Sequence, residues 1–173
     1  MEWITKTPLK TPRSGLGAAV VGDFIYAAGG TYESTPLKTT ESYNIELDCW
    51  KDSPSMNESR SGLAVTACDH NTLYAIGGWS EQSQLKTVER LDSRTGKWVS
   101  VAPMRNSKSA HRAVTVGPYI YVMGGYDGKQ ALSSVERFDC RANTWEVLAE
   151  LPSRKYSMGV ALVVNEPDYE SSQ

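Results

Sequence analysis

The chain has 173 residues, with 18 lysines plus arginines, 20 aspartates plus glutamates and a formal net charge of −2. This balance gives no broad basic field, so it argues against nucleic acid and against an acidic membrane surface as partners. The longest apolar runs are far shorter than the ~20 residues that a membrane helix needs. Residues 1–12 lack the basic and then apolar order of a secretory signal, so we expect a cytoplasmic protein.

The three cysteines are Cys49, Cys68 and Cys140, an odd number without a CxxC pair. This pattern predicts neither a disulfide framework nor a zinc site. We expect free thiols in a reducing compartment.

Every predicted element is a short strand, and no window of eleven or more residues has the apolar period of a helix. The second strand of each unit ends at two glycines, and the fourth carries a tryptophan before a proline ends the ladder. In chain order the runs are AAVV 18–21, FIYAA 24–28, TTESYN 39–44, LAVTA 63–67, LYAI 73–76, KTVERLD 86–92, AVTV 113–116, YIYVM 119–123, SSVERFD 133–139 and GVALVV 159–164. The chain is therefore predicted to be all-β.

Residues of different chemistry recur in one register at intervals of 47 or 48 residues. A period kept by four kinds of position at once is the signature of a repeated structural unit. The tryptophans are Trp3, Trp50, Trp98 and Trp145, the glutamates Glu41, Glu89 and Glu136, the cations Arg13, Arg60, Lys108 and Lys155, and the glycines Gly29, Gly30, Gly77, Gly78, Gly124 and Gly125.

A sheet of four antiparallel strands in so few residues cannot bury both faces alone, so neighbouring units must stack. Sheets stacked radially around an axis make a propeller, which leaves only short, protected edges. Where the second strand leaves the crowded axis, the backbone needs a positive φ or has no room for a side chain. The glycines and the tryptophans are therefore predicted to be structural. A phosphate-binding loop is disfavoured, because GxGxxG and a following helix are absent.

The chain resembles the kelch family in its double glycine after an apolar strand, the tyrosine before it, the VER-(L/F)-D segments and the tryptophan six residues later. The segments 124–139 and 154–164 are most similar to the propellers of BTB-kelch proteins. This resemblance implies a kelch β-propeller that acts as a substrate-recognition adaptor of cullin-based ubiquitin ligases. The first unit departs from the pattern, because GGTYES has no aromatic residue directly after the glycines.

Three complete blades are predicted, with an orphan outer strand before them and an orphan inner strand after them. Propellers of the resembling adaptors usually have six blades, so the chain looks like a C-terminal half. We expect a fragment that lacks BTB and linker domains, or a protein that covers its open apolar faces by self-association. The predicted boundaries are 1–12 for the fourth strand of a preceding blade, 13–59, 60–107 and 108–153 for the blades, 154–164 for a closing first strand and 165–173 for a disordered tail.

No constellation of reactive side chains supports catalysis. His70 lies in a turn, where we expect a solvated residue. His111 takes a slot that Leu16, Leu63 and Met158 fill elsewhere, so it is either a half-buried substitute or faces the axial channel. No paired carboxylates, Ser-His-Asp set or metal-ligand pattern lies in register, so we predict no enzyme activity, cofactor or metal.

The repeated cation and glutamate lie 28 or 29 residues apart in each unit, a regularity that suits an ion pair between the first and third strands. In one alternative the pair is structural, and breaking it leaves a lone charge at a cost of ~3–5 kcal/mol. In the other the cations lie at a surface and bind an acidic peptide. We retain Arg13, Arg60 and Lys108 as candidate partner contacts, and Glu41, Glu89 and Glu136 as structural residues.

Two classes of loop supply the other candidate partner contacts. One follows each glycine pair and carries an aromatic residue, a type suited to binding hot spots. The other begins directly after the repeated cation. In the resembling adaptors these loops meet on one face and bind an extended peptide; alternatively, the aromatics only shield neighbouring blades. The candidate positions are Ser14, Thr31, Tyr32, Ser61, Trp79, Ser109, Tyr126 and Tyr156.

These features predict a protein-interaction module that recognises a peptide or partner protein and serves as substrate receptor for a cullin-type ubiquitin ligase. An actin-binding cytoskeletal scaffold is the alternative.

Overall fold

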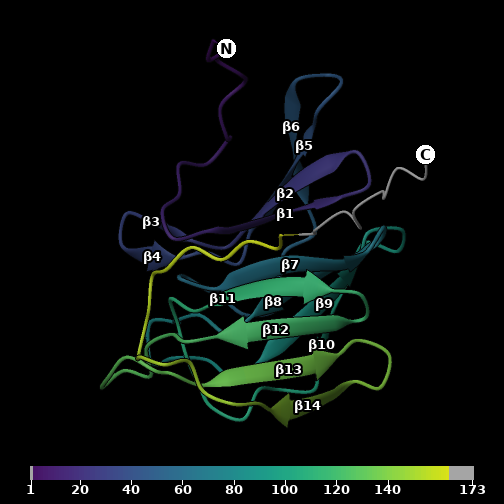
Figure 1. Ribbon diagram of the computed structural model, residues 1–173. Helices are drawn as coiled ribbons and strands as arrows, with labels where there is room; N and C mark the ends of the chain where they lie inside the picture. Colours follow the sequence, from purple (N-terminus) through teal and green to yellow (C-terminus); the bar gives the residue numbers. More distant parts are fainter. Residues whose placement is uncertain (1, 164–173) are drawn as a thin grey trace, which may run out of the picture.

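The computed structural model describes residues 2–163, which form three four-stranded antiparallel sheets, one from each repeat (Figure 1). The predicted all-β fold with three blades is confirmed. Blade 1 contains β1 (Gly17–Val21), β2 (Phe24–Ala28), β5 (Thr40–Asn44) and β6 (Cys49–Ser53), and a hairpin of β3 (Thr31–Tyr32) and β4 (Thr35–Pro36) follows β2. Blade 2 contains β7 (Ala64–Asp69), β8 (Thr72–Ile76), β9 (Val88–Asp92) and β10 (Lys97–Val101). Blade 3 contains β11 (Arg112–Val116), β12 (Tyr119–Met123), β13 (Val135–Asp139) and β14 (Thr144–Val147).

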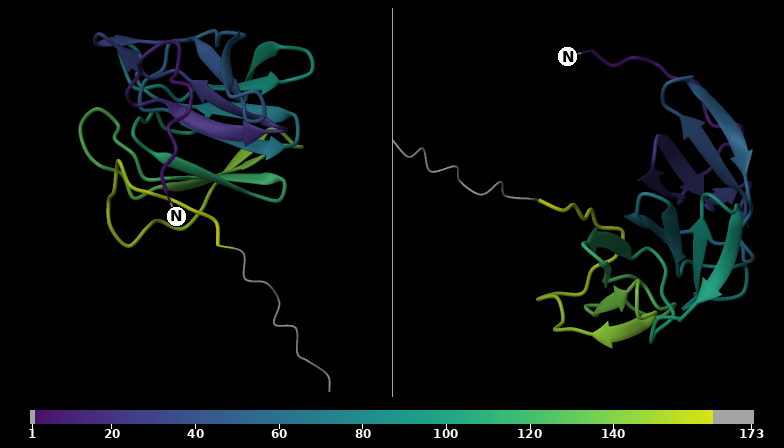
Figure 2. Two further views of the ribbon diagram at one scale, coloured as in Figure 1. Left: turned by 90° about the horizontal axis from the view of Figure 1, so that it is seen from above. Right: turned by 90° about the vertical axis from the view of Figure 1, so that its right-hand side faces the viewer.

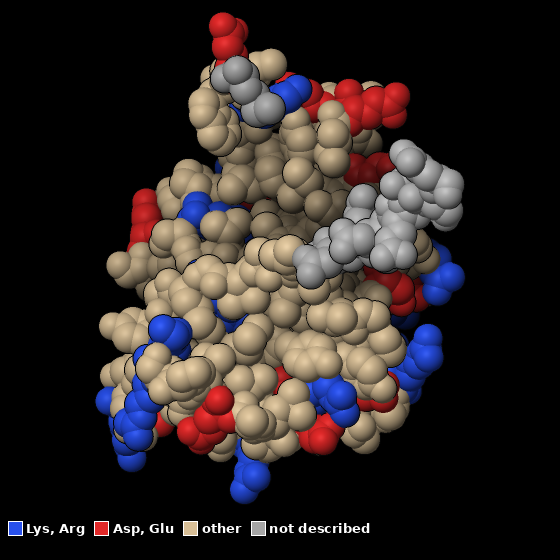
Figure 3. Space-filling view, viewed as in Figure 1, with Lys and Arg blue, Asp and Glu red and all other residues tan. Residues whose placement is uncertain are grey.

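The blades fan out in an arc, as the right-hand view of Figure 2 shows. The innermost strands converge, since β7 contacts both β1 and β11. We call the interface of blades 1 and 2 the first joint and that of blades 2 and 3 the second joint. Figure 3 views the face that carries the innermost strands, and charged side chains of both signs lie mostly around the edge of this face.

Each joint is filled by apolar side chains from both of its blades. In the first, Val21 and Ala28 pack with Leu73 and Leu91. In the second, the ring of Tyr74 meets that of Phe138 edge-on, with 5.7 Å between the ring centroids. Burial of these faces, which no single sheet can achieve, is the main favourable term that holds one blade on the next.

The tryptophans of the blades bond to the segment that precedes their own blade. The indole Nε1 of Trp98 donates to the carbonyl of Pro54 (2.8 Å), and that of Trp145 donates to the carbonyl of Ala102 (2.7 Å). Trp50 donates in the same way to Thr7 (2.9 Å). The indole N–H of each blade's tryptophan therefore finds its acceptor in the segment before that blade, while the indole rings pack.

The two predicted flanking strands are not formed in the described residues. Residues 2–12 and 159–163 contain no strand, and Trp3 is fully exposed, so the packing role predicted for Trp3 is wrong. A strand needs a hydrogen-bonded neighbour, and residues 2–163 supply none to these segments. Thr7 nevertheless takes the position of Pro54 one repeat earlier, as its bond to Trp50 shows. The predicted tail at 165–173 lies outside the described residues.

The glycine pairs combine a left-handed backbone with close approach. At Gly29 and Gly30 φ is +65° and +92°, and a Cβ on Gly29 would lie 2.4 Å from the carbonyl oxygen of Arg60 in the next blade. Gly30 donates its N–H to that same carbonyl (2.8 Å). Gly78 and Gly125 make the same bond to Lys108 and Lys155, so the second glycine of each pair connects its blade to the segment that follows.

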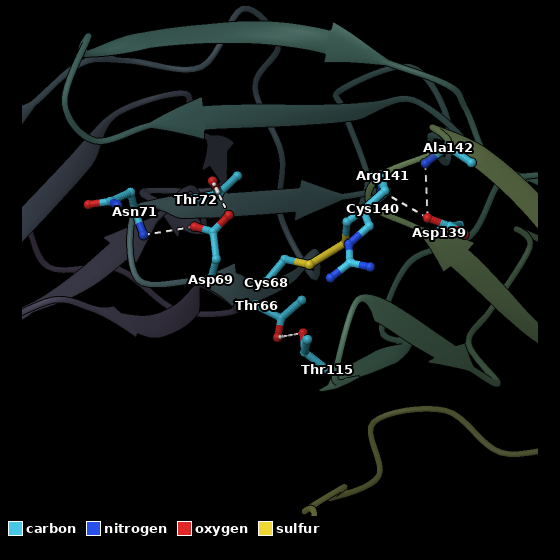
Figure 4. Close-up of a disulfide and its surroundings, with 10 residues drawn as sticks. All are labelled: Thr66, Cys68, Asp69, Asn71, Thr72, Thr115, Asp139, Cys140, Arg141 and Ala142. Carbon is cyan, nitrogen blue, oxygen red and sulfur yellow. Dashed lines mark hydrogen bonds between the residues drawn. A yellow bond between two sulfur atoms is a disulfide. The ribbon is translucent and has the colours of Figure 1, made fainter.

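The state of the cysteines differs from the predicted three free thiols. Cys68, in β7, and Cys140, directly after β13, form a disulfide across the second joint (Figure 4), and Cys49 is free. The expectation that none of the three forms a disulfide is wrong. Nothing within residues 2–163 forms a helix with the length and hydrophobicity that a membrane crossing requires.

Candidate functional site

Buried ion pairs tie the segment that precedes the first strand of each blade to the third strand of that blade. The nitrogen–oxygen distances are 2.6 Å for Arg13–Glu41, 3.0 Å for Arg60–Glu89 and 2.7 Å for Lys108–Glu136. No side chain of these six residues is more than 2% exposed. The predicted ion pairs are therefore present in all three blades.

Each ion pair belongs to a larger network of hydrogen bonds. Arg60 also donates to the carbonyl of Gly77 (2.9 Å) and to the hydroxyl of Thr87 (3.0 Å). Glu89 accepts from the backbone N–H groups of Asn57 (2.7 Å) and Glu58 (3.1 Å). The carboxylate of Glu89 thus holds the linker between blades 1 and 2 in place. The same hydrogen bonds satisfy the lone pairs that the ion pair leaves free, as a buried charge requires.

This burial removes three residues from the predicted set of partner contacts. Arg60 and Lys108 have no exposed surface, and the side chain of Arg13 has none either. A partner could reach these cations only if the blade opened. The electrostatic contact with an acidic peptide proposed for them does not fit this structure.

A row of backbone hydrogen bonds runs from blade to blade beside the ion pairs. Gly62 donates to the carbonyl of Gly15 (2.8 Å), Ala110 to that of Gly62 (2.7 Å) and Ser157 to that of Ala110 (2.8 Å). All four residues have φ between +51° and +60°. Ala110 and Ser157 hold this left-handed conformation although they are not glycines. The sequence therefore indicated it only at Gly15 and Gly62.

The two predicted loop classes are joined by hydrogen bonds. Within each blade the residue after the glycine pair exchanges backbone bonds with the residue after the cation, as an isolated β-bridge. We call these residues, with Tyr156, the contact surface. It comprises Ser14 and Thr31 from blade 1, Ser61 and Trp79 from blade 2, Ser109 and Tyr126 from blade 3, and Tyr156.

Side chains of the contact surface also touch between one blade and the part of the chain that follows it. The hydroxyl of Thr31 donates to that of Ser61 in the next blade (2.6 Å). The rings of Tyr126 and Tyr156 lie 5.9 Å apart and are tilted by 50°. Tyr156 is 57% exposed, whereas Ser109 is nearly buried. Trp79 and Tyr126 are partly exposed.

Tyr32 is set apart from this row. It lies in the β3–β4 hairpin, one position beyond Thr31, and is 42% exposed. The register therefore places Thr31, and not Tyr32, opposite Ser14 in the slot that Trp79 and Tyr126 fill in the other blades.

A polar hollow that the sequence did not suggest lies beside the contact surface. It has a volume of about 410 Å³ and is lined by Glu58 of the linker into blade 2 and by Ser80, Glu81, Gln82 and Ser83 of blade 2. The loop after Trp79 supplies most of the lining, and the residue pattern there does not repeat in the other units, so a search for periodic positions passes over it. Among the described residues, no group of three or more His, Cys, Asp or Glu side chains is placed to hold a metal ion.

His111 is wholly buried at the second joint, and neither ring nitrogen has a hydrogen-bond partner within residues 2–163. Burial, reinforced by the nearby charge of Lys108, lowers the pKa of His111 to about 3. The ring is therefore neutral in the folded protein at pH 7, and neither predicted position, half-buried or facing the channel, describes it.

His111→Leu is expected to reduce the loss of stability in acid. Unfolded histidine has a pKa near ~6.5, so between pH 6.5 and 3 the unfolded state binds the extra proton and stability falls as pH falls, by about 1.4 kcal/mol per unit. Urea unfolding at pH 7.5 and pH 5 should show the variant losing about 2 kcal/mol less than the wild type. His70→Gln, in the exposed turn, is the control, and an equal loss in His111→Leu and wild type would contradict this assignment.

Stacked four-stranded antiparallel sheets, with the innermost strands at a common centre, define a repeat protein of the propeller class. The family described as "Kelch motif" matches residues 12–57, 60–105 and 107–152. The chain belongs to the kelch-repeat family.

The chain is distantly similar to kelch-like proteins. It is 36% identical to "Kelch-like protein 4" of Homo sapiens over 64 residues, which are 37% of this chain and 9% of that protein. It is 35% identical to "Kelch-like protein 22" of Rattus norvegicus over 65 residues (36% and 10%). It is 39% identical to "Kelch-like ECH-associated protein 1B" of Danio rerio over 71 residues (39% and 12%). The matched stretches thus span about a tenth of the length of these relatives.

Proposed function

We propose that the protein is an interaction module whose contact surface binds an extended peptide of a partner protein. The supporting observation is the joining of two loop classes into one row across all three blades, with Thr31 bonded to Ser61 at one end and Tyr126 beside Tyr156 at the other. Aromatic rings with few rotatable bonds, held by a rigid scaffold, lose little entropy on binding and suit hot spots.

Tyr126→Ala is expected to weaken binding of selected peptides about 30-fold, the effect of losing a hot spot worth ~2 kcal/mol. Peptides would first be selected on the wild-type chain from a random display library, and their affinity for both proteins then measured by fluorescence anisotropy. Val116→Ser is the matched control, because Val116 is 42% exposed at the opposite end of blade 3. Equal affinities for wild type and Tyr126→Ala would refute this site.

We further propose that the whole protein is a cytoplasmic substrate receptor of a cullin-type ubiquitin ligase. This role is supported by the similarity to kelch-like proteins, and it requires domains beyond the residues matched. Co-precipitation of the full-length product with a tagged cullin tests it. Cosedimentation with actin filaments in place of cullin binding would favour a cytoskeletal scaffold.

We also propose that the outer faces of blades 1 and 3 are covered in the working protein by further propeller residues or by a second copy. Within residues 2–163 each of these faces lacks a neighbouring blade. Apolar sheet faces left open favour association. A stable monomer of this chain in sedimentation at micromolar concentration would argue against the proposal.

A further inference from the structure

The Cys68–Cys140 disulfide is a covalent link between two blades that are otherwise joined covalently only by the backbone between β10 and β11. Cys68 lies in β7 of blade 2 and Cys140 follows β13 of blade 3, at a sequence separation of 72. The disulfide is at the end of the blades opposite the contact surface, near the hydrogen bond that joins Thr66 to Thr115 (2.8 Å) (Figure 4).

Only the second joint carries this link. The equivalent positions in blades 1 and 2, 47 residues earlier, are Val21 and Ser93. Val21 is 3% exposed and packs in the apolar cluster of the first joint, so a joint of this kind forms without a disulfide. The disulfide is therefore an addition to a joint that already has an apolar core and hydrogen bonds.

The disulfide is accessible to a small molecule. Both cysteines are half-buried and line a hollow of about 340 Å³ together with Asp69, Gly117 and Arg141. A low-molecular-weight thiol can therefore approach the sulfur atoms, as exchange requires.

Charged side chains of both signs lie around the disulfide. Arg141 lines the same hollow as both cysteines, and its side chain is drawn beside them in Figure 4. The carboxylates of Asp69 and Asp139 accept hydrogen bonds, Asp69 from Asn71 and Thr72 and Asp139 from the N–H groups of Arg141 and Ala142, and both keep their negative charge. A cation beside a sulfur stabilises its thiolate, the species released when a disulfide is attacked.

We propose that Cys68 and Cys140 form a reversible redox link that a glutathione-type thiol opens and oxidation closes. In opening, a thiolate attacks one sulfur, which forms a mixed disulfide and releases the other cysteine. A second thiol attacks the mixed disulfide, which releases the second cysteine and a disulfide of the small thiol. The protein gains two electrons and two protons, and two small thiols lose them.

Opening the link is expected to loosen blade 3 on blade 2 without separating them. The Thr66–Thr115 bond, the apolar cluster and the bond from Trp145 to Ala102 all remain. Because a link that closes a long loop restricts the unfolded chain, the oxidised form should melt several degrees higher than the reduced form.

The test is a redox titration of the chain in glutathione buffers, with alkylation at each potential and counting of modified cysteines by mass spectrometry. We expect Cys68 and Cys140 to become reactive together in one two-electron step, with Cys49 reactive throughout, and a higher melting temperature for the oxidised form. Alkylation of all three cysteines in every buffer would overturn the proposal, as would a link that no buffer opens or equal melting temperatures.

The double variant Cys68→Val/Cys140→Ser keeps the test decisive, because it gives the second joint the residues of the first. It should fold, and its melting temperature should not change with the redox buffer. Cys49→Ser is the matched control and should retain the full redox shift. If the melting temperature of the double variant still changed with the redox buffer, the Cys68–Cys140 link would not be the cause of the change.

Discussion

Glu89→Gln is expected to lower the free energy of unfolding by up to about 3–5 kcal/mol, because it removes the buried counter-charge of Arg60. Only the carboxylate of Glu58, whose side chain is 42% exposed, then remains beside the guanidinium, at 2.8 Å. The side chains of Arg60 and Glu89 are at most 2% exposed, so water cannot replace the lost carboxylate. The substitution also weakens the acceptor for the N–H groups of Asn57 and Glu58, which begin the linker into blade 2. Urea unfolding monitored by circular dichroism measures the difference.

The surface pair of Arg137 and Glu146 supplies the control for this substitution. Glu146 is 57% exposed, so Glu146→Gln should cost no more than about 1 kcal/mol. If Glu89→Gln left stability unchanged and altered only peptide binding, the cation and glutamate would have to be assigned to partner recognition after all.

Gly29→Ala is expected to destabilise the protein by about 2–5 kcal/mol. Of this, ~1–2 kcal/mol comes from holding alanine at φ +65°. Another ~1–3 kcal/mol comes from the clash of its Cβ with the carbonyl oxygen of Arg60, 2.4 Å away in the next blade. Thermal and urea unfolding of the purified variant would measure the sum.

Gly22→Ala separates the two contributions within the same blade. Gly22 has a similar φ of +57°, but the nearest atom to its Cβ would be 3.9 Å away. The control should therefore show the backbone cost alone, about 1–2 kcal/mol. Equal losses in the two variants would mean that blade 2 does not approach Gly29 as closely as the structure places it.

The repeated positions made most of the fold predictable. Gly29, Trp98 and Glu89 each recur in every complete unit, because each blade needs the same turn at the axis, the same interface bond and the same buried carboxylate. Their spacing was sufficient to predict three blades of four strands. The left-handed backbone at Ala110 could not be predicted, because this position is occupied by glycine in the earlier units (Gly15 and Gly62) but by alanine here.

Features that occur in only one unit could not be predicted from the repeat. Cys68 and Cys140 replace Val21 and Ser93 of the earlier register and meet only because blades 2 and 3 stack, 72 residues apart in sequence. Lys108 illustrates a second limit. Its regular spacing to Glu136 predicted an ion pair, but only the packing of the joint decides that the pair is buried and not offered to a partner.

Amide hydrogen exchange at Gly62, Gly78 and Ala110 tests most directly whether the repeats stack as blades around a common centre. Each of these N–H groups donates across a joint, to Gly15, Lys108 and Gly62 respectively. We predict that they exchange slowly, together with the amides within β12. Slow exchange within β12 combined with unprotected exchange at all three joint amides would show isolated sheets and contradict the stacked propeller on which the contact surface depends.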